Sequence, residues 1–184
     1  MKRNKRMKSV LILCSIIFMC HASFSQELDK EQAKALTESK NLTWEANESL
    51  SENNFVEAEA DYRRAISKSN ENSAAPYNLG NAYYNTENYS EAFGRYKQAG
   101  ELAMEKADKH HAYHNMGNVF MKRKEYEKAV EAYKEALRNN PTDEETRYNY
   151  ALAKEMLKKQ QNEQQNDQNE DDKEQNEEKN KGDN

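Results

Sequence analysis

The chain has 184 residues, of which 33% are charged, and its formal net charge is −5. An acidic chain repels nucleic acid and anionic lipid headgroups, which argues against both as partners. The two cysteines, Cys14 and Cys20, lie close to the amino terminus, so the rest of the chain has no thiol for a disulfide, a soft metal or a nucleophile.

The first 25 residues have the pattern of an export signal. Five basic residues precede an apolar run over 10–20, and small residues follow it. We expect cleavage after Ser25, with cleavage after Ala22 as the alternative. An uncleaved membrane anchor is the other alternative, although an eleven-residue run is short against the ~20 residues needed to cross a bilayer. Cleavage would leave 23 basic against 33 acidic residues, a net formal charge of −10. Residues 26–38 are predicted to form a helical lead-in.

Three tyrosines, each flanked by two alanines at fixed spacing, recur along the chain. The alanine that opens each group lies at position 58, 92 and 129, so the steps are 34 and 37 residues. A period near 34 is typical of a helical repeat in which each unit has two helices. The groups are Ala58/Tyr62/Ala65, Ala92/Tyr96/Ala99 and Ala129/Tyr133/Ala136.

The spacing also predicts how the two helices of a unit pack. Gly80 and Gly117 fall inside predicted helices, where glycine costs up to ~1 kcal/mol relative to alanine. Close approach of the second helix would offset this cost, and Ala46 occupies the same place in the first unit. The alanine and tyrosine stripe is therefore predicted to be the packing side of the second helix.

These residues resemble the tetratricopeptide repeat pattern. The segments that carry the resemblance are Asn78-Leu79-Gly80-Asn81-Ala82-Tyr83-Tyr84 with Tyr89-Ser90-Glu91-Ala92, and Leu137 with Pro141 in the third unit. The first unit departs from the pattern at Ser49 and lacks a closing proline near Asn70. The resemblance implies an all-α, right-handed α-solenoid of three helix pairs over about 39–72, 73–109 and 110–141.

Three further expectations concern the later part of the chain. The three extra residues of the second unit predict a second helix lengthened by almost one turn, unless Gly100 ends it. A covering helix is predicted over 142–158, with Tyr148, Ala151, Leu152 and Met156 on its apolar side. From 159 to 184 the chain has no apolar residue, which predicts a disordered acidic tail rich in Asn and Gln.

In tetratricopeptide repeat proteins the first helices line a concave groove, and helical spacing selects the residues that would face it. Asn47, Asn81 and Asn118 fall at the centre of three such stripes. An asparagine side chain can pair with the main chain of an extended peptide without reading its sequence. Alternatively, these amides tie neighbouring helices together, above all at Asn78 and Asn115. The predicted peptide-binding groove comprises Asn47, Tyr77, Asn78, Asn81, Tyr84, His111, His114, Asn115, Asn118 and Met121.

Several kinds of site are not expected. Some members of the family clamp a C-terminal carboxylate with lysine and arginine, but Thr43, His111 and Asn115 stand at the matching positions, so we expect an internal or extended segment to bind. His110, His111 and His114 could converge on a metal, but no acid or thiol except Asp108 lies near them, and we expect no metal and no cofactor. Phosphate-binding and nucleophile motifs are absent from the sequence, so no enzyme is predicted.

The layout of signal, three repeats, covering helix and polar tail resembles the small exported repeat proteins of the Bacteroides aerotolerance (Bat) operons, as does the segment Thr146-Arg147-Tyr148-Asn149-Tyr150-Ala151-Leu152-Ala153-Lys154. This resemblance implies a periplasmic protein, soluble or membrane-associated, that acts as an adaptor with membrane-anchored von Willebrand A-domain proteins. The alternatives are a general periplasmic scaffold or chaperone-like module, and a structural protein that self-associates through its repeats. A small-molecule substrate is not expected.

Overall fold

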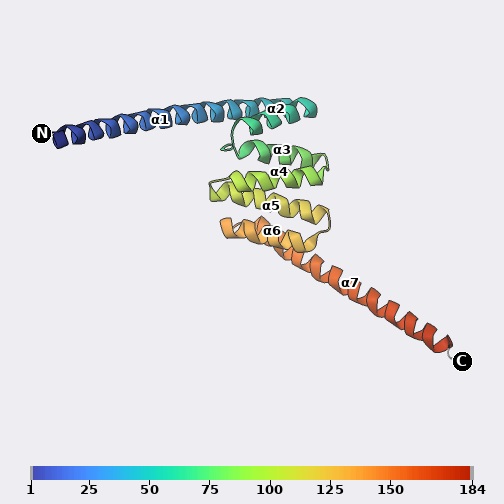
Figure 1. Cartoon of the computed structure of the whole chain (residues 1–184). Helices are drawn as coiled ribbons and strands as arrows, with labels where there is room; N and C mark the ends of the chain where they lie inside the picture. The colour runs from blue at the N-terminus through green and yellow to red at the C-terminus, as the bar shows by residue number, and fades with distance from the viewer. Residues whose placement is uncertain (1, 183–184) are drawn as a thin grey trace. The chain divides into compact units, whose positions relative to one another are not determined.

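The computed structural model describes the backbone of residues 2–182 and the side chains of residues 26–165. Within this part the chain forms helices and no strand, which confirms the predicted all-α class (Figure 1). The contacts divide it into two units, Met1–Ala75 with α1 and α2, and Pro76–Asn184 with nearly all of α3 and the later helices. The helices are α1 (Lys2–Ser51), α2 (Phe55–Lys68), α3 (Ala74–Asn85), α4 (Tyr89–Leu102), α5 (Lys106–Lys122), α6 (Tyr126–Asn139) and α7 (Glu144–Gly182).

The proposed signal lies within α1, and the side chains of residues 1–25 are outside the described residues. Its cleavage and the export of the chain therefore stay predictions. Among the side chains described, none of the helices combines the length and the apolar character that crossing a membrane requires.

In the first unit, α1 and α2 pack through small residues and one tyrosine. Ala46, Ala58, Tyr62 and Ala65 have no exposed surface. Polar residues also connect the two helices. The Ser39 hydroxyl on α1 donates to the Ala65 carbonyl on α2 at 2.7 Å. The amide of Asn72 donates to the hydroxyls of Ser39 and Thr43, at 2.8 and 2.9 Å. The first repeat thus forms its helix pair despite its departures from the family pattern.

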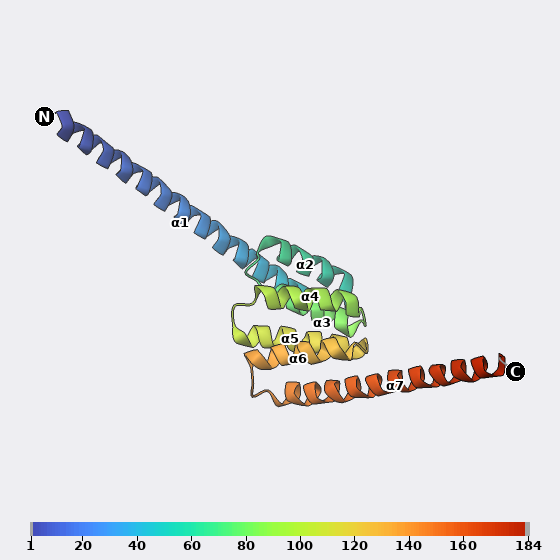
Figure 2. The same ribbon diagram turned by 60° about the horizontal axis from the view of Figure 1, so that its bottom comes forward.

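In the second unit, the glycines mark the closest approach of paired helices, as predicted. A β-carbon on Gly80 would lie 2.8 Å from the Tyr96 ring, and one on Gly117 would lie under 3 Å from the Tyr133 ring. Both rings are almost completely buried between their flanking alanines. The glycine therefore makes room for the tyrosine, which fills the space between α3 and α4 and between α5 and α6. Figure 2 shows successive helices of this unit lying beside one another.

The turn inside each repeat has the same geometry three times. Asn53, Glu87 and Lys124 have φ values of 62°, 60° and 58°, in the left-handed region. In each turn the next residue donates its N–H to the carbonyl five residues back along the helix, as Asn88 does to Tyr83 at 2.9 Å. This Schellman arrangement ends the first helix, and the second helix then begins at the aromatic that recurs in each repeat, Phe55, Tyr89 or Tyr126.

The structure corrects one expectation about helix lengths. The three extra residues of the second repeat do not lengthen α4, which has 14 residues like α2 and α6; instead α5 begins earlier and has 17 residues against 12 in α3. The backbone of α7 is helical to Gly182, beyond the predicted boundary at 158. The side chains of residues 166–184 are outside the described residues, so the disorder of the acidic tail stays a prediction.

The apolar side of α7 is only partly the predicted one, since Leu152 and Met156 are half-buried as predicted. Tyr148 is 69% exposed and Ala151 is exposed, whereas Thr146 and Ala153 are completely buried. Tyr150 packs against the core cluster formed by α5 and α6. The helix is therefore rotated from the predicted orientation, because hydrogen bonds of Thr146 fix its first turn.

Candidate functional site

The second unit contains a polar recess between α3 and α5, on the face where the sequence predicted a groove. Its volume is about 290 Å³. Two helices supply the amides, with Asn81 on α3 and Asn115 and Asn118 on α5. The recess is lined by Asn81, Tyr84, Asn85, Tyr96, Asn115 and Asn118.

A buried tyrosine holds the central asparagine of each repeat. The Tyr96 hydroxyl donates to Oδ1 of Asn81 at 2.8 Å, and the Tyr133 hydroxyl donates to Oδ1 of Asn118 at 2.6 Å. In the first unit Tyr62 donates to Asn47 at 2.5 Å in the same way. Burial raises the pKa of Tyr62 to about 12 and raises the pKa of Tyr96 and Tyr133, so these hydroxyls stay protonated donors. Each asparagine is thereby fixed with its carbonyl toward the tyrosine and its amide nitrogen away from it.

Further hydrogen bonds connect the asparagines of α3 and α5. Nδ2 of Asn115 donates to the Tyr77 hydroxyl at 3.1 Å and to Oδ1 of Asn81 at 3.2 Å. Nδ2 of Asn118 lies 3.5 Å from Oδ1 of Asn115. Nδ2 of Asn81 donates to no side chain among those described, and no buried polar side-chain atom of this part lacks a partner, so that nitrogen is open to solvent. The recess therefore offers a fixed amide donor beside a carbonyl acceptor on Asn115, which suits the main chain of a peptide.

Half-buried aromatic rings flank the amides. The Tyr77 ring lies 5.8 Å from the Tyr96 ring and 6.5 Å from the ring of His111, which is exposed. The Tyr84 ring meets Tyr89 edge to face at 5.5 Å, and burial raises the pKa of Tyr84. These rings provide apolar surface beside polar groups, the composition expected of a peptide-binding site.

Two predicted groove residues have other roles in the structure. His114 is buried, and its Nδ1 is 2.6 Å from the Thr146 hydroxyl, so α7 covers it. Met121 packs against the core cluster of α5 and α6. The prediction placed both in the open groove because helical spacing on α5 alone does not show where α7 packs.

The remaining predicted residues lie in different parts of the molecule. Asn47 is exposed on α1 in the first unit, and Asn78 is half-buried on α3. Tyr77, Asn81, Tyr84, Asn115 and Asn118 are brought together in the second unit.

The histidines of α5 serve as packing groups. Nδ1 of His110 is 3.1 Å from the Ala136 carbonyl, and Nε2 is 3.6 Å from Asp143. Nε2 of His114 is 3.5 Å from Glu145, while burial lowers the pKa of His114. The described residues include no group of three or more His, Cys, Asp or Glu side chains able to hold a metal ion.

Sequence reasoning missed two residues that line the recess and one residue of α7 that contacts it. Asn85 lines it and lies four residues after Asn81, a spacing that could have identified it. Tyr96 was assigned to packing alone, although its hydroxyl reaches the recess. Asn149 on α7 has its Nδ2 3.5 Å from Oδ1 of Asn118, which no spacing within one helix could indicate.

Sequence comparison identifies the repeats. Family models described as tetratricopeptide repeat match residues 49–116 and 111–143. The chain contains tetratricopeptide repeats. A tetratricopeptide repeat domain is typically a non-enzymatic module for protein interaction. A comparison with curated proteins found no match.

Solved tetratricopeptide repeat structures share this fold. The first such domain of Spaghetti (RPAP3), bound to the HSP90 peptide SRMEEVD, is 19% identical with a TM-score of 0.59, over 66% of this chain and 94% of that one. The first tetratricopeptide repeat domain of human RPAP3 is 19% identical with a TM-score of 0.60, over 69% of this chain and 98% of that one. The N-terminal domain of stress-induced protein-1 from C. elegans is 20% identical with a TM-score of 0.59, over 67% and 97%.

Proposed function

We propose that this protein is a non-enzymatic adaptor that binds an extended segment of a partner protein in the polar recess of its repeats. The observation that supports this most is the open amide of Asn81, held in place by Tyr96 and placed beside the Asn115 carbonyl. A rigid donor and acceptor on a partly apolar surface recognise main chain at a small entropic cost, because the side chains are already ordered.

Similar structures support a peptide as the ligand. Spaghetti carries the HSP90 peptide SRMEEVD, and the second domain of human RPAP3 carries the HSP70 peptide SGPTIEEVD. Both peptides have the same last four residues, whereas this chain has Thr43, His111 and Asn115 where a carboxylate clamp would need basic residues. We therefore propose an internal segment as the ligand, rather than a free C-terminus.

The finer proposal concerns the partner and the compartment. We propose that the chain is exported to the bacterial cell envelope and works in a Bat-type stress complex with membrane-anchored von Willebrand A-domain proteins. The export pattern of residues 1–25 and the resemblance of the whole layout support this proposal.

Site-specific crosslinking in the native envelope tests both levels. A photoreactive residue at Tyr84 or Asn118 is expected to crosslink to an internal segment of one partner, and the same residue at exposed Glu155 serves as the control. Crosslinks that map only to a partner's terminal carboxylate would contradict the internal-segment proposal. Recovery of a partner without a von Willebrand A domain would contradict the finer proposal and leave the adaptor function standing.

A further inference from the structure

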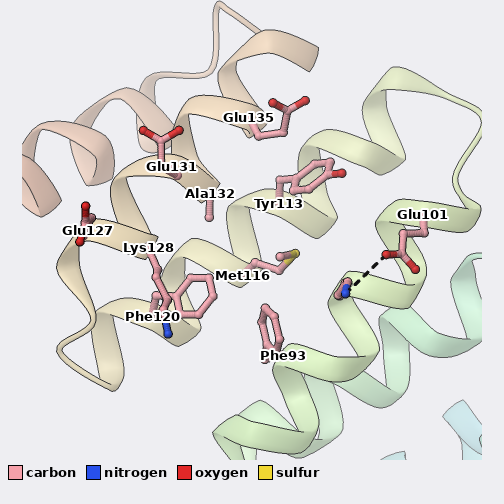
Figure 3. A pocket seen from close by; sticks show the side chains of 11 residues that line it. Phe93, Glu101, Tyr113, Met116, Phe120, Glu127, Lys128, Glu131, Ala132 and Glu135 are labelled. Carbon is pink, nitrogen blue, oxygen red and sulfur yellow. Dashed lines mark ion pairs between the residues drawn. The ribbon is translucent and has the colours of Figure 1, made fainter.

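A second hollow lies on another side of the second unit, where α4, α5 and α6 meet (Figure 3). We call it the acid-rimmed groove; its volume is about 430 Å³. Phe93, Met116 and Phe120 form its floor, and Glu127, Glu131 and Glu135 of α6 form one rim. At about 100° per residue, Met116 and Phe120 lie on the side of α5 roughly opposite Asn118, so this groove is separate from the polar recess.

The floor of the groove is apolar and incompletely covered. The Phe93 and Phe120 rings are 5.1 Å apart, and Figure 3 shows both rings and Met116 turned toward the same space. Phe93 and Met116 pack against the core cluster but are only half-buried. Apolar side chains left open in a hollow are a common feature of protein-interaction sites.

The rim of the groove has an excess of negative charge. Four glutamates and two lysines line it. Both lysines are already engaged: Lys97 is 3.8 Å from Glu101, and Lys128 pairs with Glu125 and lies over the Phe120 ring. The groove therefore presents carboxylates without a matching set of free cations of its own.

The three glutamates of α6 are arranged in a row. They are four residues apart, so they lie about 6 Å from one another along the helix. Glu131 and Glu135 pair with Lys134 and Arg138 on the exposed surface of α6. Surface pairs of this kind are worth about 0–1 kcal/mol, so a partner's cation can replace them.

We propose that the acid-rimmed groove binds an amphipathic helix of another protein, whose apolar side chains contact Phe93, Met116 and Phe120 and whose lysines or arginines pair with Glu127, Glu131 and Glu135. A basic edge with four-residue spacing on that helix would match the row of carboxylates. A second copy of this chain is a poorer occupant, because its own net charge of −5 repels an acidic rim. The proposal is independent of the polar recess.

Fluorescence polarisation with the full chain tests it. The probe is a labelled helix-forming peptide of about 18 residues, with leucines on one face and lysines along its edge; the matched peptide has glutamates in place of the lysines. We expect the lysine peptide to bind at least about tenfold more tightly than the glutamate peptide. We expect the double variant Glu131→Lys with Glu135→Lys, called the rim variant, to bind the lysine peptide about tenfold more weakly than the wild-type chain does.

The control changes the net charge by the same amount elsewhere. Glu91→Lys with Glu155→Lys alters two exposed residues outside the groove, and we expect affinity within about twofold of wild type. If the rim variant loses helicity by circular dichroism, Glu131→Gln with Glu135→Gln replaces it. Met116→Ala is expected to weaken binding without any change of charge.

Three results would overturn the proposal. The first is equal affinity of the lysine peptide for the wild-type chain and the folded rim variant. The second concerns NMR spectra recorded with the peptide: chemical shifts of backbone amides that change at Asn81 and Asn118, and not at Phe93 and Phe120, would place the peptide in the polar recess. The third is a concentration-dependent dimer that the rim substitutions dissociate, which would assign the groove to a second copy.

Discussion

A single hydrogen bond connects the core of each repeat to its polar face. The tyrosine of the alanine–tyrosine–alanine group is buried, yet its hydroxyl reaches an asparagine 15 residues earlier in the chain. A buried hydroxyl that lacks a partner is costly, so the asparagine stabilises the core. The tyrosine in turn orients the asparagine, so the same bond contributes to stability and to the geometry of the recess.

Replacement of the Tyr96 hydroxyl should therefore have two effects. Tyr96→Phe is expected to destabilise the chain by about 1–2 kcal/mol, because Oδ1 of Asn81 loses the closer of its two donors in a half-buried site and keeps only Nδ2 of Asn115. Urea unfolding followed by circular dichroism measures the change. Tyr148→Phe is the control, since Tyr148 is 69% exposed, and its unfolding midpoint should stay the same. Equal midpoints for Tyr96→Phe and wild type would show that the bond contributes nothing to stability.

Replacement of glycine by alanine is expected to have opposite effects on stability at two helical positions, Gly117 and Gly94. Gly117→Ala would place a β-carbon against the Tyr133 ring, and we expect a loss of about 1–3 kcal/mol. Gly94→Ala meets no atom within 4 Å on the exposed side of α4, and we expect a gain of up to about 1 kcal/mol from helix propensity. Thermal or urea unfolding of the two variants compares them directly. A gain from Gly117→Ala would mean that the Tyr133 ring moves aside freely.

The sequence predicts these packing residues well and their polar partners poorly. Spacing assigned the alanines and tyrosines to the packing side, and the structure confirms that they are buried. It gave the tyrosines no role beyond packing, although their hydroxyls reach the asparagines of the first helix, because the ring is long enough to pass Gly80 or Gly117. Helical periodicity identifies which residues share one face of a helix. Which groups of the neighbouring helix a side chain contacts depends also on the length of that side chain.

At the level of elements, α7 is held to α5 by a polar contact that the sequence did not indicate. The Thr146 hydroxyl bonds with Nδ1 of His114 on α5. At the start of α7 itself, the N–H of Thr146 donates to the Asp143 carboxylate at 2.8 Å. These bonds fix the first turn of the helix and bury Thr146 in place of Tyr148. An amphipathic pattern on a helix with so few apolar residues does not fully determine its orientation, so the prediction from the pattern alone was wrong for Tyr148 and Ala151.

Because the His114 imidazole is buried, we expect the free energy of unfolding to depend on pH. Burial lowers the pKa of His114 below its ordinary value near 6.5, despite the nearby carboxylates of Glu145 and Asp143. The neutral ring is then the form that fits the folded state, so its contribution is complete above pH 6.5 and is lost as the pH falls toward the lower folded pKa. The pKa of Asp143 is also lowered, mainly by hydrogen bonds from Thr146, so its contribution is lost only in more acidic solution.

Urea unfolding at pH 7.5 and pH 5.0 measures this effect. We expect a lower midpoint at pH 5.0 for the wild-type chain and a smaller difference between the two conditions for His114→Gln. His111→Gln changes an exposed histidine on the same helix and is expected to keep the wild-type dependence. A midpoint that rises at pH 5.0 would mean that pairing with Glu145 outweighs burial.

For the molecule as a whole, α7 provides the final layer of the second unit, and among its described side chains those that are buried or half-buried lie between residues 146 and 160. Thr146 and Ala153 are completely buried and Tyr150 packs on the core cluster, whereas residues 161–165 are exposed. In an array of repeats each layer is stabilised mainly by its neighbours, so an uncovered last repeat loses stability and exposes apolar surface. Shortening the chain at two places should therefore have very different results.

Ending the chain after Asn140 is expected to cost at least about 3 kcal/mol, since Tyr150 and its apolar neighbours each contribute about 1.5–3 kcal/mol when buried. Ending it after Gln165 removes residues 166–184, which follow the exposed residues 161–165, and should leave the urea midpoint unchanged. The same two chains differ in self-association, because the uncovered side of α5 and α6 can pair with a second copy. Light scattering should show a monomer for residues 1–165 and larger species for residues 1–140. Matching midpoints and masses for the two chains would mean that α7 does not stabilise the repeats.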